Sequence, residues 1–383
     1  MVVGLVKYFL TLIFVKLGQY LFLLVLLYGG QISVIQENIV VALVYFISLT
    51  SVVDASVGPY LSKIARTNKR DENLVFYVLL PSLGCILFLL YLKYLRISEL
   101  GPKEYLAPCI IVSLILLHRL RYAHNLGSVS VNTANLRYGA FYITNILLLI
   151  IVQNHYVSEY FFELFLILNL FMLVLSFYSI ELKFQVRSLL MFLTWGKFLI
   201  FTSLAAIVFS SVDRIFIFPK FERDALLAVD TIMWLQILVL LPTLVYPILV
   251  KTIFDGQYKI RHCFIFTISI LLVGSILYLL ISTLMYLGTV DELYQLDKYF
   301  KIYISFALCY PFFLYCLANG IFYHQFILNV SGILCFIFGE SYFVSAPEKI
   351  EFWSQLTMAF AGLYIIMSLL LKKLEDDRNQ HAE

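Results

Sequence analysis

Long apolar runs separated by short polar connectors make up nearly the whole chain. Each run spans about 17 to 25 residues, the length that an α-helix needs to cross a bilayer. The strict alternation of a transmembrane β-strand is absent. The pattern predicts an all-α polytopic membrane protein with about twelve transmembrane helices. We expect them near residues 8–28, 37–58, 74–95, 105–127, 138–153 and 159–179, and near 190–217, 225–249, 263–287, 300–318, 325–341 and 352–371.

The twelve runs form two similar sets of six. The segment Pro59–Lys63, at the end of the second run, matches Pro247–Lys251, at the end of the eighth, at an offset of 188 residues. The same offset lays the first six runs over the second six within a few residues, which indicates an internal parallel repeat. The sequence therefore predicts an N-terminal six-helix lobe over 1–184, a C-terminal six-helix lobe over 185–373, and a disordered cytoplasmic tail over 374–383.

Composition supports a membrane protein and excludes several other classes. Of the 383 residues, 62% are hydrophobic and only 13% are charged, which a set of soluble domains would not show. The net charge is only +3 and no basic cluster is present, so no nucleic acid partner is expected. The six cysteines lie in or beside apolar runs without a C-x-x-C pair, and we interpret them as small buried side chains.

The distribution of Lys and Arg predicts the orientation of the chain. With a cytoplasmic N-terminus, the connectors and tail on the cytoplasmic side hold 14 of the 27 Lys and Arg residues, and the opposite connectors hold 8. Because cytoplasmic loops carry an excess of these residues, both termini are expected in the cytoplasm. No connector is long enough for a soluble catalytic domain, so any chemistry must occur among the helices.

A polar stripe marks the fourth predicted helix, where side chains recur at spacings of three and four and so share one side. Its members are His118, Arg121, Asn125, Ser128 and Asn132, with Arg119 and His124 beside them. One interpretation is a cationic lining for an anionic substrate, since Arg can hold phosphate oxygens in a bidentate manner. The other is that the helix ends near Leu120 and the stripe lies in a cytoplasmic connector.

Charged residues inside the other predicted helices are few, and each costs about 2.5 to 3.5 kcal/mol at the centre of a bilayer. Lys16 either faces a substrate cavity or extends its long side chain to the interface. Asp54 either couples transport to an ion or caps local backbone. Asp213 and Arg214 form either a structural ion pair or a gate. Asp230 is interpreted as an acid in the first turn of its helix, where the helix dipole favours it.

The sequence carries no sign of enzymatic chemistry. Metal-ligand spacings, a phosphate loop, a nucleophile elbow and paired catalytic carboxylates are all missing from it. His118 and His124 are six residues apart and fall on different faces of a helix, which argues against a shared metal. We therefore expect neither a metal nor another cofactor, and no enzyme.

Three short motifs resemble the Wzx-type polysaccharide flippases, within the superfamily of multidrug, oligosaccharidyl-lipid and polysaccharide exporters. Val52–Arg66 looks like the glycine-containing exit of the second helix with its basic loop. Val212–Ile217 contains an Asp-Arg pair similar to that late in the seventh helix of the family, and Tyr246–Leu249 is similar to its proline-containing end of the eighth. The chain is short for the family, and Pro219 stands where a glycine-rich exit is usual.

The resemblance implies a MATE- or MurJ-like architecture in a bacterial inner membrane. It implies a transporter that moves undecaprenyl-diphosphate-linked oligosaccharide units to the outer leaflet, for O-antigen or other surface polysaccharide. Its partners would be the lipid-linked oligosaccharide, membrane lipid, a polysaccharide polymerase and a chain-length regulator. Under this hypothesis Lys16, His118, Arg119 and Arg121 bind substrate, and Asp54 with the Asp213 and Arg214 pair serves coupling or gating.

Two alternatives remain open. A multi-span enzyme of the same pathway, such as an O-antigen polymerase, would also have many helices, but polymerases typically use a large outer loop that this chain lacks. A drug or small-molecule exporter of the same superfamily would share the repeat but prefer an acidic cavity, whereas the charges inside the predicted helices lean basic.

Overall fold

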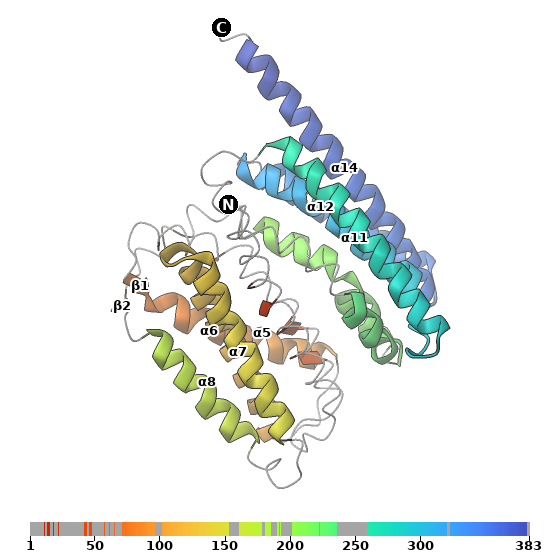
Figure 1. Cartoon of the computed structure of the whole chain (residues 1–383). Helices are drawn as coiled ribbons and strands as arrows, with labels where there is room; N and C mark the ends of the chain where they lie inside the picture. Colours follow the sequence, from red (N-terminus) through yellow and green to blue (C-terminus); the bar gives the residue numbers. More distant parts are fainter. Residues whose placement is uncertain are drawn as a thin grey trace. The chain divides into compact units, whose positions relative to one another are not determined.

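The computed structural model describes residues 71–95, 102–152, 161–177, 181–184, 201–221, 223–235, 259–319 and 322–380, together with scattered positions before residue 71 and at 190 and 192. The chain divides into two compact units, Met1–Ile200 and Phe201–Glu383, and each is considered by itself (Figure 1). Apart from one pair of three-residue strands, the regular structure of the described residues is helical. The repeat between two lobes stays a prediction.

Unit 1 contains four long described helices and the strand pair. The helices are α5 (Leu74–Tyr94), α6 (Pro102–Ser128), α7 (Val131–Val152) and α8 (Phe161–Phe177), and the strands β1 (Asp71–Asn73) and β2 (Glu181–Lys183) pair in parallel. Asn73 starts α5, because its side-chain oxygen accepts a hydrogen bond of 3.1 Å from the backbone N–H of Val75. Helices α5, α6 and α8 agree with the predicted runs within three residues at each end, whereas α7 begins seven residues before the predicted run at 138–153.

Helix α6 is the centre of the described part of unit 1, since it packs against α5, α7 and α8. Gly84 of α5 allows close approach to α6, because a Cβ at this position would lie 2.3 Å from a side-chain carbon of Leu116. A helix with neighbours on several sides can keep polar residues away from lipid. This arrangement explains why α6 is more polar than α5, which is apolar enough to span a membrane.

Unit 2 begins with a broken helix and continues with four long ones. Its described elements are the helix Phe201–Ser210, the π-helix η2 (Asp213–Ile217), the 3-10 helix η3 (Phe218–Lys220), a helix over 223–235, α11 (Ile260–Tyr286), α12 (Leu296–Ala318), α13 (Phe322–Gly339), the 3-10 helix η4 (Glu340–Tyr342) and α14 (Ala346–Gln380). Asp230 lies in the middle of its helix rather than in the first turn, so the first-turn interpretation is wrong.

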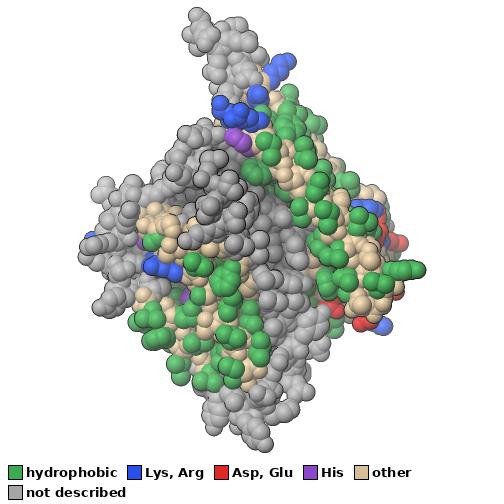
Figure 2. Space-filling model, viewed as in Figure 1, with side chains coloured by type: hydrophobic (Ala, Val, Ile, Leu, Met, Phe, Trp, Pro, Cys, Tyr) green, Lys and Arg blue, Asp and Glu red, His purple; other side chains and the backbone are tan. Residues whose placement is uncertain are grey.

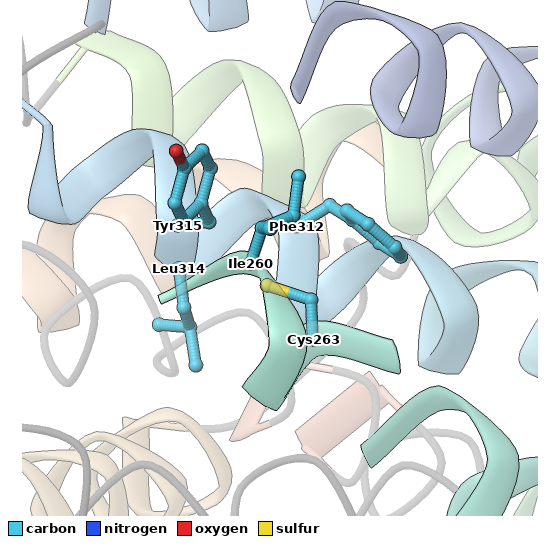
Figure 3. Close-up of a cluster of buried hydrophobic side chains, with 5 residues drawn as sticks. All are labelled: Ile260, Cys263, Phe312, Leu314 and Tyr315. Carbon is cyan, nitrogen blue, oxygen red and sulfur yellow. The ribbon is translucent and has the colours of Figure 1, made fainter. Parts of the chain in front are cut away.

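Helices α11, α12 and α14 lie side by side and form the body of unit 2 (Figure 1). At the start of α11, Ile260 and Cys263 pack against Phe312, Leu314 and Tyr315 near the end of α12 (Figure 3). The thiol of Cys263 also donates to the carbonyl oxygen of Pro311 at 3.4 Å. This contact accompanies the proline in α12, which is tolerated in membrane helices when neighbours contact the local backbone.

The outward faces of these helices are apolar. Ile268, Leu272 and Leu279 of α11 are 60–64% exposed, and Figure 2 shows hydrophobic side chains along α11 with charged ones gathered toward its ends. Such a continuous apolar surface is unstable in water and suits contact with lipid tails. The protein is therefore an all-α polytopic membrane protein.

The described residues contain five helices that are long and apolar enough to cross a membrane, and a sixth if the broken helix counts as one span. The five are α5, α11, Leu296–Cys316, Tyr323–Tyr342 and Ala346–Leu374. The figure of twelve spans includes runs outside the described residues and stays a prediction. Helix α14 continues to Gln380, so the expectation of a disordered tail is wrong for residues 374–380.

Candidate functional site

The residues proposed from the sequence fall into three groups. Lys16 and Asp54 lie outside the described residues. His118, Arg119 and Arg121 lie in α6 of unit 1, whereas Asp213 and Arg214 lie in η2 of unit 2. All five of the described candidates are buried. Their exposed fractions are 7% for His118, 8% for Arg119, 4% for Arg121, 0% for Asp213 and 6% for Arg214.

The polar stripe of unit 1 lies within one helix and not in a connector. Helix α6 continues without a break from Pro102 to Ser128, so the alternative that it ends near Leu120 is wrong. Asn132 belongs to the following helix, α7, and is therefore not part of the same helix face. Arg119 and Arg121 point in different directions around α6, yet both are buried because other helices surround α6.

Two side-chain contacts position Arg121 and His118 of α6. The guanidinium Nη1 of Arg121 lies 3.0 Å from Nδ1 of His124, and both side chains are buried. The ring of His118 stacks on Phe141 of α7 with 3.8 Å between the ring centroids. Nε2 of His118 is buried and has no hydrogen-bond partner among the residues that the structure describes. It is thus available to a ligand or a water that reaches this place.

A network of neutral polar groups joins the same region of α6 to α7. The hydroxyl of Tyr122 donates to Oδ1 of Asn135 at 2.8 Å, and Nδ2 of Asn135 donates to Oγ1 of Thr11 at 3.3 Å. Thr11 in turn donates to Oδ1 of Asn132 at 3.3 Å. Apart from Asn132, sequence reasoning did not single out these residues. Neutral polar residues are common in membrane helices, so only their three-dimensional contacts distinguish them.

The Asp213 and Arg214 pair lies at a break in the first helix of unit 2. The segments Phe201–Ser210 and Asp213–Lys220 meet at an angle of 71°. At the break the N–H of Ser211 donates to the carbonyl of Val208 at 3.2 Å in the 3-10 pattern, and beyond it the N–H of Phe218 donates to the carbonyl of Asp213 in the π-helical pattern. Short π-helical segments occur frequently at functional sites, so the pair lies where the backbone itself departs from the α-helix.

The break leaves backbone groups that other side chains must satisfy. The carbonyl oxygen of Phe209 accepts a hydrogen bond of 3.2 Å from the indole N–H of Trp353, a buried residue of α14. The Phe209 ring packs so tightly on α13 that a Cβ at Gly332 would lie 2.7 Å from it. Irregular backbone at membrane depth is tolerated when it is buried in protein. Trp353 and Gly332 provide this burial.

The two charges at the break have each other as a partner. Nε of Arg214 lies 3.6 Å from Oδ1 of Asp213, which is an ion pair but longer than a good hydrogen bond. Arg214 also donates from Nη2 to the hydroxyl of Tyr303 in α12 at 3.5 Å. The arrangement links η2 to α12. It is compatible both with a clamp between helices and with a gate.

A cluster of ion pairs lies at one end of unit 2, which we call the Glu340 end. The carboxylate of Glu340 accepts from Lys220 at 2.9 Å and from Lys349 at 2.8 Å, so it ties the end of the broken helix to the connector between α13 and α14. Nearby in the chain, the hydroxyl of Tyr294 donates to Asp224 at 2.9 Å. Burial, and then this hydrogen bond, raises the pKa of Tyr294.

Among the described residues, no group of three or more His, Cys, Asp or Glu side chains could hold a metal ion. In unit 1, two buried guanidinium groups lie on α6, and guanidinium groups are suited to binding anionic oxygens. No family model matches the chain. No curated protein matches it at a significant level either. The resemblance to Wzx-type flippases is therefore supported by the short motifs alone and stays a prediction.

Proposed function

We propose that the protein is a flippase that carries an undecaprenyl-diphosphate-linked oligosaccharide unit across a bacterial inner membrane. The unit would enter from the cytoplasmic leaflet and leave on the outer side, for the synthesis of O-antigen or another surface polysaccharide. Transport would proceed by alternating access between two six-helix lobes. The protein would act as a transporter and not as an enzyme.

The observation that carries the proposal is the buried cationic cluster of α6. Two guanidinium groups, of Arg119 and Arg121, are kept inside unit 1 rather than in a connector. Charges inside membrane helices are costly and usually face the interior of the helix bundle, where they pair or line a path for ions or substrates. A diphosphate carries anionic oxygens, which a guanidinium group can hold in a bidentate manner.

The broken helix of unit 2 supports a transport cycle. Discontinuous membrane helices are common in transporters, where the break allows one half to change direction. The half that ends at Lys220 is attached through Glu340 to the connector between α13 and α14. Breaking this attachment would free the segment to bend at η2. Asp213 and Arg214 would then act as the gate that the sequence suggested.

The charges at the two ends of unit 2 support the proposed orientation. At the end opposite Glu340, α11 begins after Lys259 with Arg261, and α14 carries Lys372 and Lys373. The Glu340 end instead mixes acidic and basic side chains. Because Lys and Arg concentrate on the cytoplasmic side, this charge difference supports a cytoplasmic position for the end of unit 2 that holds Lys259, and for the C-terminus.

Removal of the protein from its host tests the function. The expected result is loss of surface polysaccharide with lipid-linked precursor accumulating on the cytoplasmic face of the membrane. Accumulation of short repeat units that are already external would instead indicate a polymerase. Efflux of a small cation that continues when the polysaccharide is absent would indicate an exporter.

The cationic cluster is tested by replacing Arg119 and Arg121 with Gln, singly and together. Each change should reduce translocation of the lipid-linked precursor at normal expression, because a charge that holds the diphosphate is lost. The matched control is Arg137→Gln, which neutralises an exposed arginine of α7 in the same unit. Unchanged translocation in both arginine variants would contradict the assignment of the cluster to the substrate.

A further inference from the structure

We propose that His124 is a positioning residue that holds the guanidinium of Arg121 in its substrate-binding orientation. This inference rests on the proposed function, because it assigns a role to a second residue at the same site. Sequence reasoning placed His124 beside the polar stripe and rejected it as a metal ligand, but gave it no partner. The structure gives it a different partner.

The contact fixes the chemical state of His124. A guanidinium group can only donate hydrogen bonds, so Nδ1 of His124 must accept at the observed 3.0 Å. The imidazole is then neutral and carries its proton on Nε2. Protonation at Nδ1 would place two N–H groups against each other and would break the contact.

Helix geometry explains why these two residues meet. Positions 121 and 124 are three residues apart on a continuous helix and so lie on the same face, one turn apart. Ser128 lies one turn further, and its hydroxyl is 3.4 Å from the same Nδ1. Because Arg121 makes the shorter contact, we assign Nδ1 to the guanidinium and treat Ser128 as a secondary donor.

Orientation matters for Arg121 because its side chain is long and has many rotamers. The guanidinium has five N–H groups in a planar fork, and holding one of them with His124 leaves the others in a fixed direction. A site whose donors are already oriented binds an anionic ligand more tightly, since less freedom is lost on binding.

Two substitutions separate positioning from general packing. In His124→Asn, the side-chain oxygen can occupy the place of Nδ1 and still accept from Arg121, whereas in His124→Gln the amide lies nearer the place of Nε2. The probe is undecaprenyl diphosphate, bound to the full-length protein purified in detergent. We expect His124→Gln to weaken binding about tenfold, as for loss of a hydrogen bond to a charged group, and His124→Asn to bind nearly as the natural protein does.

Arg137→Gln is the matched control, because it changes an exposed side chain of α7 and should leave binding unchanged. In the background of Arg121→Gln, the His124→Gln change should have no further effect, since the group to be positioned is gone. Equal binding by the Asn and Gln variants would overturn the positioning role. So would a full additional loss in the Arg121→Gln background.

Nitrogen-15 NMR of labelled histidines measures the contact without any ligand. The signal that disappears in His124→Asn should show a neutral ring with the proton on Nε2, and a ring protonated on Nδ1 would overturn the proposal. Failure of the natural protein to bind the probe, with the expected histidine state present, would instead contradict the proposed function. The two failures are therefore distinguishable.

Discussion

The ion pair at the helix break can be tested by a double-mutant cycle on Asp213 and Arg214. The variants are Asp213→Asn, Arg214→Gln and the two together. Both side chains are buried, and the charged atoms are 3.6 Å apart. At an effective dielectric constant of about 20, two unit charges at this distance attract each other by about 5 kcal/mol. The desolvation of both groups opposes this attraction.

The single changes should be much more damaging than the double change. Removing one partner leaves a buried charge without compensation, which costs about 3 to 5 kcal/mol. Removing both eliminates the attraction and the desolvation together, so the double variant should lie within about 1 to 2 kcal/mol of the natural protein. The interaction energy of the cycle should therefore exceed about 2 kcal/mol.

The assay is reversible unfolding of the purified protein in detergent micelles, with the free energy of unfolding compared among the four proteins. The matched control is Arg223→Gln, an exposed arginine at the start of the next helix, which should change the free energy of unfolding by less than about 0.5 kcal/mol. If the two single losses simply add, with an interaction energy below about 0.5 kcal/mol, the residues do not act as a pair and the clamp is refuted. Normal stability of a single variant with lost transport would favour the gate.

Three further outcomes are expected. Asn145 and Asn169 exchange hydrogen bonds of 3.0 and 2.7 Å between α7 and α8, so replacing either with Leu should lower the free energy of unfolding by about 1 to 2 kcal/mol, and a double-mutant cycle should show coupling; independent effects would contradict this. Trp353→Phe should cost about 1 to 3 kcal/mol, because the carbonyl at the helix break loses its donor, and no loss of thermal stability would show that another group satisfies it. The pKa of Tyr294 is raised in the folded protein, so folding favours its neutral form. Its contribution to the free energy of unfolding is therefore complete below the unfolded pKa of about 10 and is lost as the pH rises through the folded pKa. The free energy of unfolding of the natural protein should therefore fall as the pH rises above about 10, and this fall should be smaller in Tyr294→Phe.

The limits of the long helices follow from the sequence because membrane helices are a local property of the chain. A run of apolar residues of lipid length must form a helix in a bilayer, since its backbone groups have no other partners there. The run at 263–287 corresponds to α11 at Ile260–Tyr286, and the run at 300–318 to α12 at Leu296–Ala318. The boundaries differ by only a few residues, at ends where connectors and caps decide.

The sequence also identified charged residues whose presence inside a membrane helix has to be explained, but it did not supply the explanation. A charge at membrane depth can be recognised from the residue and its place in the run, which is why Arg121 and Asp213 could be selected. Whether α6 continued past Leu120 could not be settled in the same way. The answer depends on α5, α7 and α8, which surround α6 and bury its polar side chains.

The break in the first helix of unit 2 is a purely tertiary feature. Residues 201–220 form one mostly apolar run with a charged pair at 213 and 214, and nothing local in it marks a bend of 71°. The bend is held by Trp353, which lies 144 residues from the carbonyl that it satisfies, and by Gly332, which makes room for the ring of Phe209. The sequence by itself determined which segments are helical and which charges are costly, because both depend on neighbours along the chain. Only the tertiary structure decided where a helix breaks and which groups satisfy its open hydrogen bonds, because those partners are distant in sequence and meet only when the helices pack.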